Sequence, residues 1–270
     1  MGRVVVSYSA GAASAVALKV CATAWAKRHE IHAINCNLSK DEHPDNARFT
    51  ADVERWTGIA VERLDNPKYP GGIDDVFLQV RFIVGPSGAA CTKRLKQQPA
   101  DAYCLPDDIR VIGYTVEEQD RIDRMEERHP DWTFGWVLRD AGITKTDCYN
   151  ILNNAGIELP MMYRLGYGHN NCIGCVKGGR GYWNKIRRDF PETFAKRAIV
   201  QREIGAGFGG GDAQFFLDEL KPDEGRDQKE PDIECGVFCA GYSGVLSDAA
   251  ILAGAKDEDR LAFIAAAGRK

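Results

Sequence analysis

A strand, a turn of small residues and a helix follow one another within residues 4–28, and this succession limits the folds open to the chain. Val4 to Val6 are three β-branched residues in a row, which is typical of a short buried strand. Residues 7–14 are small or carry a hydroxyl group. Residues 15–28 then place apolar side chains about one helical turn apart, with basic side chains on the other side, which predicts a helix. A strand that leads directly into a helix favours a sheet with helices packed on it.

The turn between this strand and this helix has the properties of an anion-binding site. Free backbone N–H groups and the positive end of the helix dipole point at such a turn. Residues without bulk let a phosphate group approach the backbone, and serine hydroxyls can donate hydrogen bonds to it. The residues predicted to contact the ligand are Ser7, Ser9, Ala10, Gly11, Ala12, Ala13 and Ser14. The alternative is an ordinary turn of a parallel sheet, in which small residues serve packing alone.

Strand and helix patterns continue to alternate, with short connections, to about residue 160. Strands are predicted at 30–38, 59–64 and 108–114, and helices at 47–58, 73–82, 116–129 and 147–154. We therefore expect residues 1–160 to form an α/β domain with a doubly wound, mostly parallel, Rossmann-like sheet. Ligands of such sheets lie at the carboxyl ends of the strands. This rule adds Asn37, Gly113, Tyr114 and Thr115 to the predicted ligand-binding residues.

Composition and charge exclude several classes of protein. The 270 residues suffice for a sizeable core, and 44% hydrophobic and 27% charged content is ordinary for a globular protein. The net charge of −4 gives no overall positive field that would attract nucleic acid, and no run of about 20 apolar residues could span a membrane. Because residues 1–3 lead straight into a strand, we expect no signal peptide, a cytoplasmic location and no membrane partner.

The pattern changes after residue 160. Residues 161–240 are predicted to form a smaller segment of loops and helices, including a helix over 182–204 that Pro191 divides. Residues 241–270 are rich in alanine and are predicted to form a tail, either as one helix or partly disordered.

Cysteine is the most informative residue type in the second part of the chain. The nine cysteines are an odd number in a chain without a secretion signal, so a disulfide framework is not expected. Two residues separate Cys172 from Cys175, and three separate Cys235 from Cys239. Each pair places two thiolates on one tight turn, and two pairs complete a tetrahedral four-sulfur site. We predict that these four cysteines bind zinc or a [4Fe–4S] cluster, in which Cys91 can replace one of the four.

Two other interpretations of the cysteines stay open. Cys172 and Cys175 could form a redox-active dithiol, or their spacing could be due to chance. The remaining cysteines fall within apolar stretches of predicted helix or strand and are expected to fill the core. They are Cys21, Cys36, Cys104 and Cys148.

Arg121 is the charged residue singled out as a candidate catalytic group. It follows the strand predicted at 108–114, and a guanidinium group suits bidentate contact with phosphate or sulfate. The other charges of this helix are expected to be solvated and paired one turn apart, as in Asp120 with Arg124. The same pattern would pair Glu117 with Arg121.

Five segments, in a shared order along the chain, resemble motifs of one family. Residues 9–14 (SAGAAS) are similar to its Ser-Gly-Gly-x-Asp-Ser turn, and 91–99 (CTKRLKQQP) to its Cys-containing, basic segment that ends in proline. Residues 113–121 (GYTVEEQDR) are similar to its Gly-x-x-x-Glu-Ser…Arg strand end. Residues 171–175 (NCIGC) look like a C-x2-C that holds an iron–sulfur cluster, and 234–236 (ECG) like the Glu-Cys-Gly of reductases. The family is the phosphoadenosine phosphosulfate (PAPS) reductase-like branch of the adenine nucleotide α-hydrolase (PP-loop ATPase) superfamily.

The resemblance covers roughly residues 1–240 and is to the standalone members that are common in phage genomes. It implies a PP-loop, HUP-like fold that binds an adenine nucleotide, either ATP, AMP or PAPS, with Mg²⁺ as a further cofactor. It also implies an enzyme of sulfur metabolism or of nucleotide and nucleic-acid modification. In a sulfur-transfer reaction, the acceptor would be a nucleobase or a nucleic-acid backbone.

Two alternatives to that function follow from the same residues. In a thiol-dependent PAPS reductase, the Cys235 thiolate attacks the sulfur of PAPS, and a thioredoxin-like reductant then releases sulfite. Cys235 cannot then be a permanent metal ligand. In a nucleotide-binding module without catalysis, the chain keeps the fold but not the chemistry, because Ala10 and Ala13 stand where the family has glycine and aspartate.

Overall fold

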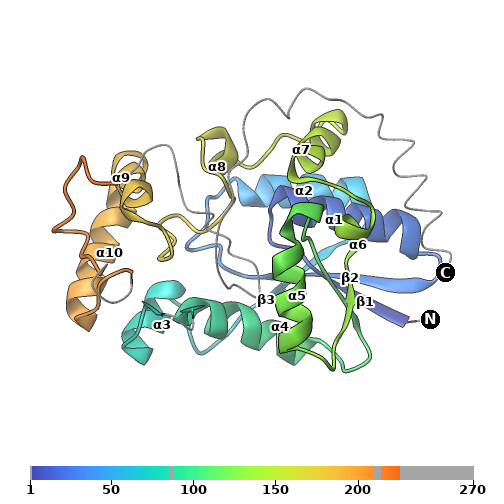
Figure 1. Ribbon diagram of the computed structural model, residues 1–270, viewed down its shortest axis with the longest axis horizontal. Coiled ribbons are helices and arrows are strands. Elements are labelled where there is room, and N and C mark those ends of the chain that lie inside the picture. The colour runs from blue at the N-terminus through green and yellow to red at the C-terminus, as the bar shows by residue number, and fades with distance from the viewer. Residues whose placement is uncertain (1, 86–87, 210–213, 226–270) are drawn as a thin grey trace.

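Five parallel strands form the central sheet of the computed structural model, which describes residues 2–85, 88–209 and 214–225. Their order across the sheet is β3-β2-β1-β6-β7 (Figure 1). The strands are β1 (Gly2–Ser7), β2 (His29–Cys36), β3 (Val61–Leu64), β6 (Ile109–Ile112) and β7 (Thr133–Gly135). The prediction of an α/β fold with a mostly parallel, Rossmann-like sheet is confirmed.

Helices cover both faces of this sheet. One face is covered by α1 (Ala12–Val20), α2 (Asn46–Thr57), α6 (Val137–Asp140) and α7 (Lys145–Asn154), and the other by α4 (Gln98–Tyr103) and α5 (Gln119–Arg128). Val4 and Val6 belong to the first core, and Val5 belongs to the second. Alternate residues of a strand point to opposite faces, so a strand covered on both sides is apolar throughout. This explains the unbroken valines of β1.

Local sequence signals set several element boundaries. Thr144 caps α7, because its Oγ1 accepts from the Asp147 N–H at 3.0 Å while the Asp147 carboxylate accepts from the Thr144 N–H at 2.9 Å. Gly58 ends α2 in the left-handed conformation, with φ +73°. The end of α2 agrees with the helix predicted over 47–58, whereas α7 begins at Lys145, two residues before the predicted start. The first helix begins at Ala12 instead of residue 15, and it continues as a π-helical turn, Cys21–Trp25.

Short elements depart most from the sequence-based expectations. The apolar run 132–138 contains the edge strand β7, which pairs only with β6 among the described strands. Helix α8 (Met161–Arg164) lies in a stretch that was expected to be a loop. The segment before α4 is π-helical over Thr92–Gln97, and β4 (Val84–Gly85) pairs antiparallel with β5 (Gly88–Ala89). Elements this short depend on tertiary contacts more than on their own sequence.

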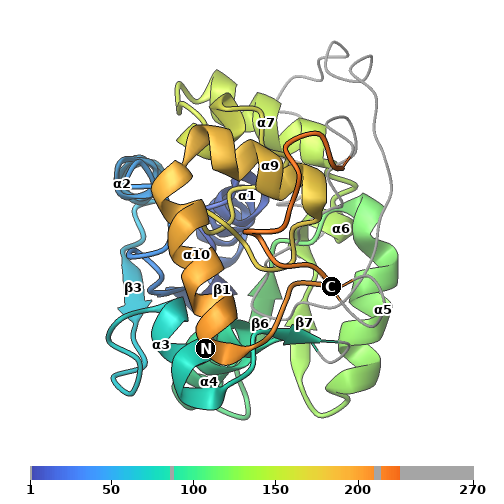
Figure 2. The same ribbon diagram turned by 90° about the vertical axis from the view of Figure 1, so that its left-hand side faces the viewer.

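A further core lies at the end of the molecule toward which the parallel strands run (Figures 1 and 2). It joins α3 (Ile73–Val80), α9 (Arg180–Asp189) and α10 (Pro191–Ile204) to the loop that carries Cys172 and Cys175. Trp183 is fully buried at its centre and stacks on Phe208, with ring centroids 4.8 Å apart. Residues on both sides of position 160 build this core. The expected tail, 241–270, lies outside the described residues.

A buried ion-pair cluster fastens α10 to the loop that follows β2. Arg197, 2% exposed, donates from Nη2 to Asp41 Oδ1 at 2.9 Å and also pairs with Asp74. Asp41 accepts from the Ile73 N–H at 2.9 Å through Oδ2, and its backbone carbonyl accepts from the Ile173 N–H at 2.7 Å. The cluster therefore holds α3, α10 and the cysteine loop against one segment.

Asp45 makes a second connection, between the sheet domain and α8. Its ionisation makes the stability of the protein depend on pH. Its carboxylate accepts from Arg48 Nε at 2.8 Å and from the Met161 N–H at 2.9 Å. The hydrogen bond from Arg48 is the main reason why the pKa of Asp45 falls to about 2. The folded-state pKa lies below the ordinary value of about 4, so this stabilisation is present above pH 4 and disappears as the pH falls toward 2.

We expect Asp45→Asn to lower the free energy of unfolding by about 1–2 kcal/mol at pH 6 and by much less near pH 2. Urea unfolding at both pH values measures this difference. The exposed Asp131 supplies the control, and Asp131→Asn should change stability little at either pH. An Asp45 effect that is equal at both pH values would contradict the prediction.

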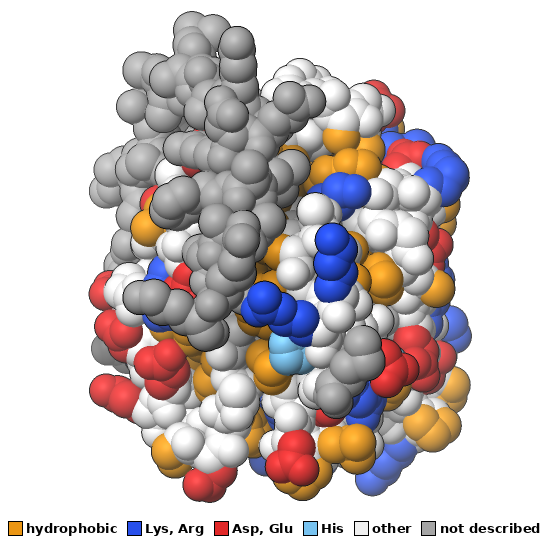
Figure 3. Space-filling model, turned by 90° about the vertical axis from the view of Figure 1, so that its right-hand side faces the viewer, with side chains coloured by type: hydrophobic (Ala, Val, Ile, Leu, Met, Phe, Trp, Pro, Cys, Tyr) orange, Lys and Arg blue, Asp and Glu red, His pale blue; other side chains and the backbone are white. Residues whose placement is uncertain are grey.

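The surface carries charges of both signs. On the face in Figure 3, the described lysine and arginine side chains are interspersed with acidic and apolar ones. Among the described residues, no helix is both long enough and apolar enough to cross a membrane.

Candidate functional site

The turn after β1 is closed by its own serines. Ser14 Oγ donates to the Gly11 carbonyl at 2.9 Å and accepts from the Ser9 N–H at 3.1 Å. Ala10 adopts a left-handed conformation, with φ +55°, and Gly11 is the N-cap of α1. The N-cap Gly11 makes no side-chain capping hydrogen bond, and the first turn of α1 contains no acidic residue. The N-terminal end of the helix therefore keeps its positive character toward the turn.

The end of β6 lies directly against this turn. A Cβ atom at Gly113 would be 2.8 Å from Ser14 N and 2.9 Å from Ala13 C, so only glycine allows the approach. The strand order reverses between β1 and β6, and doubly wound sheets bind ligands at that point. The turn at residues 7–14 and the end of the strand at 113–115 were expected at one edge of the sheet, and the structure brings Gly113 against Ala13 and Ser14.

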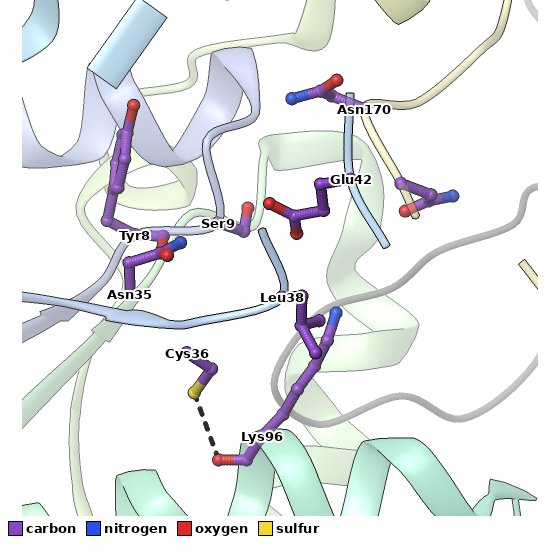
Figure 4. Close-up of a pocket in the computed structure, with 9 residues that line it drawn as sticks. Tyr8, Ser9, Asn35, Cys36, Leu38, Glu42, Lys96 and Asn170 are labelled. Carbon is purple, nitrogen blue, oxygen red and sulfur yellow. Dashed lines mark hydrogen bonds between the residues drawn. The ribbon is translucent and has the colours of Figure 1, made fainter. Parts of the chain in front are cut away.

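A pocket opens beside the turn, at the carboxyl ends of β1 and β2 (Figure 4). The pocket is partly open to solvent, and Ser9 is the turn residue that lines it. The other lining residues are Tyr8, Asn35, Cys36, Leu38, Glu42, Lys96, Asn170 and Asn171. The Glu42 carboxylate points toward Ser9 in Figure 4. Acceptor and donor groups from four separate parts of the chain thus converge here.

Asn170 connects this pocket to the turn. Its Nδ2 donates to the Ala10 carbonyl and to Asn46 Oδ1, both at 2.8 Å. Asn46 Nδ2 in turn donates to Glu42 Oε2 at 3.1 Å. Asn170 is 8% exposed, and its buried Oδ1 has no hydrogen-bond partner among the described residues. An unpaired buried oxygen is unfavourable and uncommon, and such groups concentrate where proteins bind ligands.

Tyr163 covers part of the helix N-terminus. Its hydroxyl oxygen takes hydrogen bonds from the backbone of Ala12 and Asn170, while burial raises its pKa to about 12. The tyrosine is therefore neutral at physiological pH. A Cβ atom at Gly11 would lie 3.5 Å from the same hydroxyl. The N–H group of Ala12 therefore faces the hydroxyl oxygen of Tyr163. A phosphate oxygen bound at the helix N-terminus would occupy a similar place.

The predicted ligand-binding residue Asn37 and the candidate catalytic residue Arg121 do not line the pocket. Asn37 Nδ2 donates to Asp65 Oδ1 at 2.8 Å, toward the end of β3, and Asn37 is not among the residues that line the pocket. Arg121 lies over the Tyr114 ring, with Cζ 4.2 Å from its centroid, and pairs with Glu118. Arg121 thus pairs with the residue three positions before it, and not with Glu117 as in the alternative of a solvated helix with pairs four residues apart. Arg121 stays close to the end of β6 but does not line the described pocket.

Cys172 and Cys175 lie on one rigid turn. Each is 5% exposed, and Gly174 between them has φ +71°, which favours glycine. The Cys175 N–H donates to the Tyr182 hydroxyl at 2.8 Å, and this hydroxyl donates to the Cys172 carbonyl at 3.3 Å. Burial is the main cause that raises the pKa of Tyr182, and the nearby Cys175 adds to it. The geometry supplies two thiols on one turn, as a four-sulfur site requires.

The rest of the predicted metal site is not part of the described structure. Cys235, also the candidate nucleophile, and Cys239 lie outside the described residues. Cys91 is half-buried against the core that contains Cys172 and Cys175. Within the described ranges, no three His, Cys, Asp or Glu side chains are arranged to hold a metal ion.

The other cysteines differ in their surroundings. Cys21 and Cys148 are fully buried in the core, as expected, and burial raises the pKa of Cys21 to about 12. Cys36 is buried but also lines the pocket, where its Sγ donates to the Lys96 carbonyl at 3.3 Å. Cys104 is only half-buried, so its assignment to the core interior is wrong. It lies after the last residue of α4, where the chain leaves the sheet face.

Comparisons with known proteins add no relative to this picture, since the chain matches none of the protein-family models and none of the curated proteins searched. The assignment of function rests on the geometry of the turn, the pocket and the cysteine pair.

Proposed function

We propose that this protein binds an adenine nucleotide, either ATP, AMP or PAPS, with its phosphates at the N-terminus of α1. The observation that carries the proposal is the pocket beside the turn that leads into α1, where Oδ1 of the nine-tenths buried Asn170 has no hydrogen-bond partner among the described residues. Its place between β1 and β6 is the ligand-binding position of doubly wound sheets. Backbone N–H groups would hold the phosphate oxygens, and the serines would keep the turn in shape.

The motif resemblance extends this proposal to a reaction class. We propose a PAPS reductase-like member of the PP-loop superfamily that acts in sulfur metabolism or in nucleotide and nucleic-acid modification. Ala13 stands where the family motif has a carboxylate, so the first turn of α1 offers no carboxylate to Mg²⁺. Glu42 is the carboxylate that lines the pocket, and it would contact a Mg²⁺ ion that accompanies the nucleotide.

We also propose that Cys172 and Cys175 are two of four ligands to zinc or a [4Fe–4S] cluster, with Cys235 and Cys239 as the others. The support is the pair of buried side chains on the turn that Gly174 makes possible. A bound metal or cluster would order the segment around the pocket and, as a cluster, could also carry electrons.

Calorimetry with ATP, AMP and PAPS tests the nucleotide site. We expect at least one of the three to bind. Gly11→Val should weaken that binding at least tenfold, about 1.4 kcal/mol, because its γ-methyl groups extend into the turn beyond the Cβ position. Gly11→Ala is the matched control: its Cβ makes only ordinary contacts of 3.5 Å, and the backbone at Gly11 is extended. Absence of binding by all three nucleotides would remove the proposed function.

Metal analysis after purification without oxygen tests the cysteine site. About four irons per chain, with visible absorbance, indicate a [4Fe–4S] cluster, and one zinc in a colourless protein indicates a structural site. The double variant Cys172→Ser, Cys175→Ser should lose the metal, whereas Cys104→Ser should retain it. A metal-free protein that releases sulfite from PAPS would instead support Cys235 as the nucleophile, and nucleotide binding without any turnover would support the non-catalytic module.

A further inference from the structure

We propose that Asn170 is a positioning residue that keeps Ala10 in its left-handed conformation and so makes nucleotide affinity depend on the Cys172–Cys175 turn. The inference rests on the proposed nucleotide site and adds a means of regulation to it. Asn170 is near the cysteines in sequence and touches the phosphate turn in space. Its side-chain Nδ2 donates to the Ala10 carbonyl at 2.8 Å.

Ala10 is the reason why the turn needs such a residue. Its φ of +55° is a conformation that glycine adopts freely but that brings the Cβ of other residues close to the backbone. Ala10 is 2% exposed, so neighbouring groups must hold it in place. The Asn170 side chain does so through the 2.8 Å bond from Nδ2 to the Ala10 carbonyl. The Tyr163 hydroxyl also accepts backbone hydrogen bonds from Asn170 and Ala12, and so links Asn170 to the residues that follow Ala10.

The direction of the Asn170 amide is fixed by its partners. A carboxylate can only accept, so the 3.1 Å bond to Glu42 makes Asn46 present Nδ2 to Glu42 and Oδ1 to Asn170. The Ala10 carbonyl also can only accept. Both contacts therefore require the NH₂ group of Asn170. An acceptor in its place would face two oxygens.

The cysteine turn fixes where the Asn170 backbone lies. Cys172 follows Asn170 by two residues, and its carbonyl accepts from the buried Tyr182 hydroxyl at 3.3 Å. The next residue, Ile173, donates its N–H to the Asp41 carbonyl at 2.7 Å. We therefore expect a change at the cysteine turn, such as loss of a bound metal, to reach the Ala10 carbonyl through Asn170. Binding of nucleotide and order at the cysteine turn should favour each other by the same factor.

A rescue experiment tests the positioning role. Asn170→Ala should weaken binding of the tightest of ATP, AMP and PAPS about five- to tenfold in calorimetry, and Asn170→Asp, which keeps the shape but not the donor, should weaken it at least as much. Adding Ala10→Gly to Asn170→Ala should return the affinity to within about twofold of wild type, because glycine needs no partner at φ +55°. Asn153→Ala, at an exposed position of α7, is the control and should change nothing. A loss that Ala10→Gly does not rescue overturns the role.

A double-mutant cycle tests the coupling. The pair Cys172→Ser, Cys175→Ser should weaken nucleotide binding about fivefold in the wild-type background and less than twofold in the Ala10→Gly background. Equal losses in both backgrounds would overturn coupling through Asn170. If wild type binds none of the nucleotides, the proposed function fails, but thermal unfolding still decides the positioning role. Asn170→Ala should then lower the melting temperature, and Ala10→Gly should recover most of the loss.

Discussion

Replacing Arg197 with methionine is expected to lower the free energy of unfolding by about 3–5 kcal/mol, because it leaves a buried carboxylate without its cation. Asp41 and Asp74 are 8% and 6% exposed, and both pair with this guanidinium group. Lys196, at 2.6 Å, would still neutralise Asp74, but Asp41 has no second cation among the described residues. Urea unfolding measures the loss, which should lie toward the lower end of that range.

The same variant should weaken nucleotide binding. Asp41 lies between Leu38 and Glu42, which line the pocket, so an unpaired Asp41 disturbs the wall of the site. Arg202→Met supplies the matched control, because Arg202 pairs with Asp218 at the surface, at 2.8 Å, and is 44% exposed. Its loss should change stability and affinity little. If both variants unfolded equally easily, the buried cluster would not be what fastens α10 to the loop after β2.

The parts of the site that sequence could predict are those built from neighbouring residues. The strand, turn and helix over residues 4–28 could be predicted because each has its own local signal. β-Branched residues favour the strand, small residues favour the turn, and apolar residues one helical turn apart favour the helix. The meeting of this turn with Gly113 also followed from sequence, because the carboxyl ends of parallel strands share one edge of a sheet. Even there, the helix began earlier than its apolar period suggested, because the small residues 12–14 also fit a first helical turn.

The parts that sequence could not predict depend on distant contacts. Asn170 lies 160 positions from Ala10, and a polar residue in a loop is ordinarily solvated. The ion pair of Arg197 with Asp41 could not be predicted either, since nothing local to either residue shows that α10 packs on the loop after β2. An alanine at position 10 was visible in the sequence, but its left-handed φ and its partner were not. These distant contacts distinguish the candidate site from an ordinary turn between a strand and a helix.

Gly113→Ala should have the largest effect on nucleotide binding of any single substitution considered for the turn. Its Cβ would lie 2.8 Å from Ser14 N and 2.9 Å from Ala13 C and Ser14 Cα. These are backbone atoms of the first turn of α1, so they cannot rotate away as a side chain would. Either the start of α1 or the end of β6 has to move, and overpacking of this kind costs about 1–3 kcal/mol of stability.

Nucleotide affinity should fall further than stability, because the N–H groups that would hold the phosphate move with the helix. A misplacement of about 1 Å at a site can cost about 100-fold, which corresponds to about 2.7 kcal/mol in binding. Calorimetry with the tightest of ATP, AMP and PAPS, together with urea unfolding, separates the two effects. At Gly168 an added Cβ meets nothing within 4 Å, so Gly168→Ala should leave both quantities unchanged. If Gly113→Ala lost stability but bound nucleotide normally, nucleotide binding would not depend on the close packing of β6 against the turn between β1 and α1.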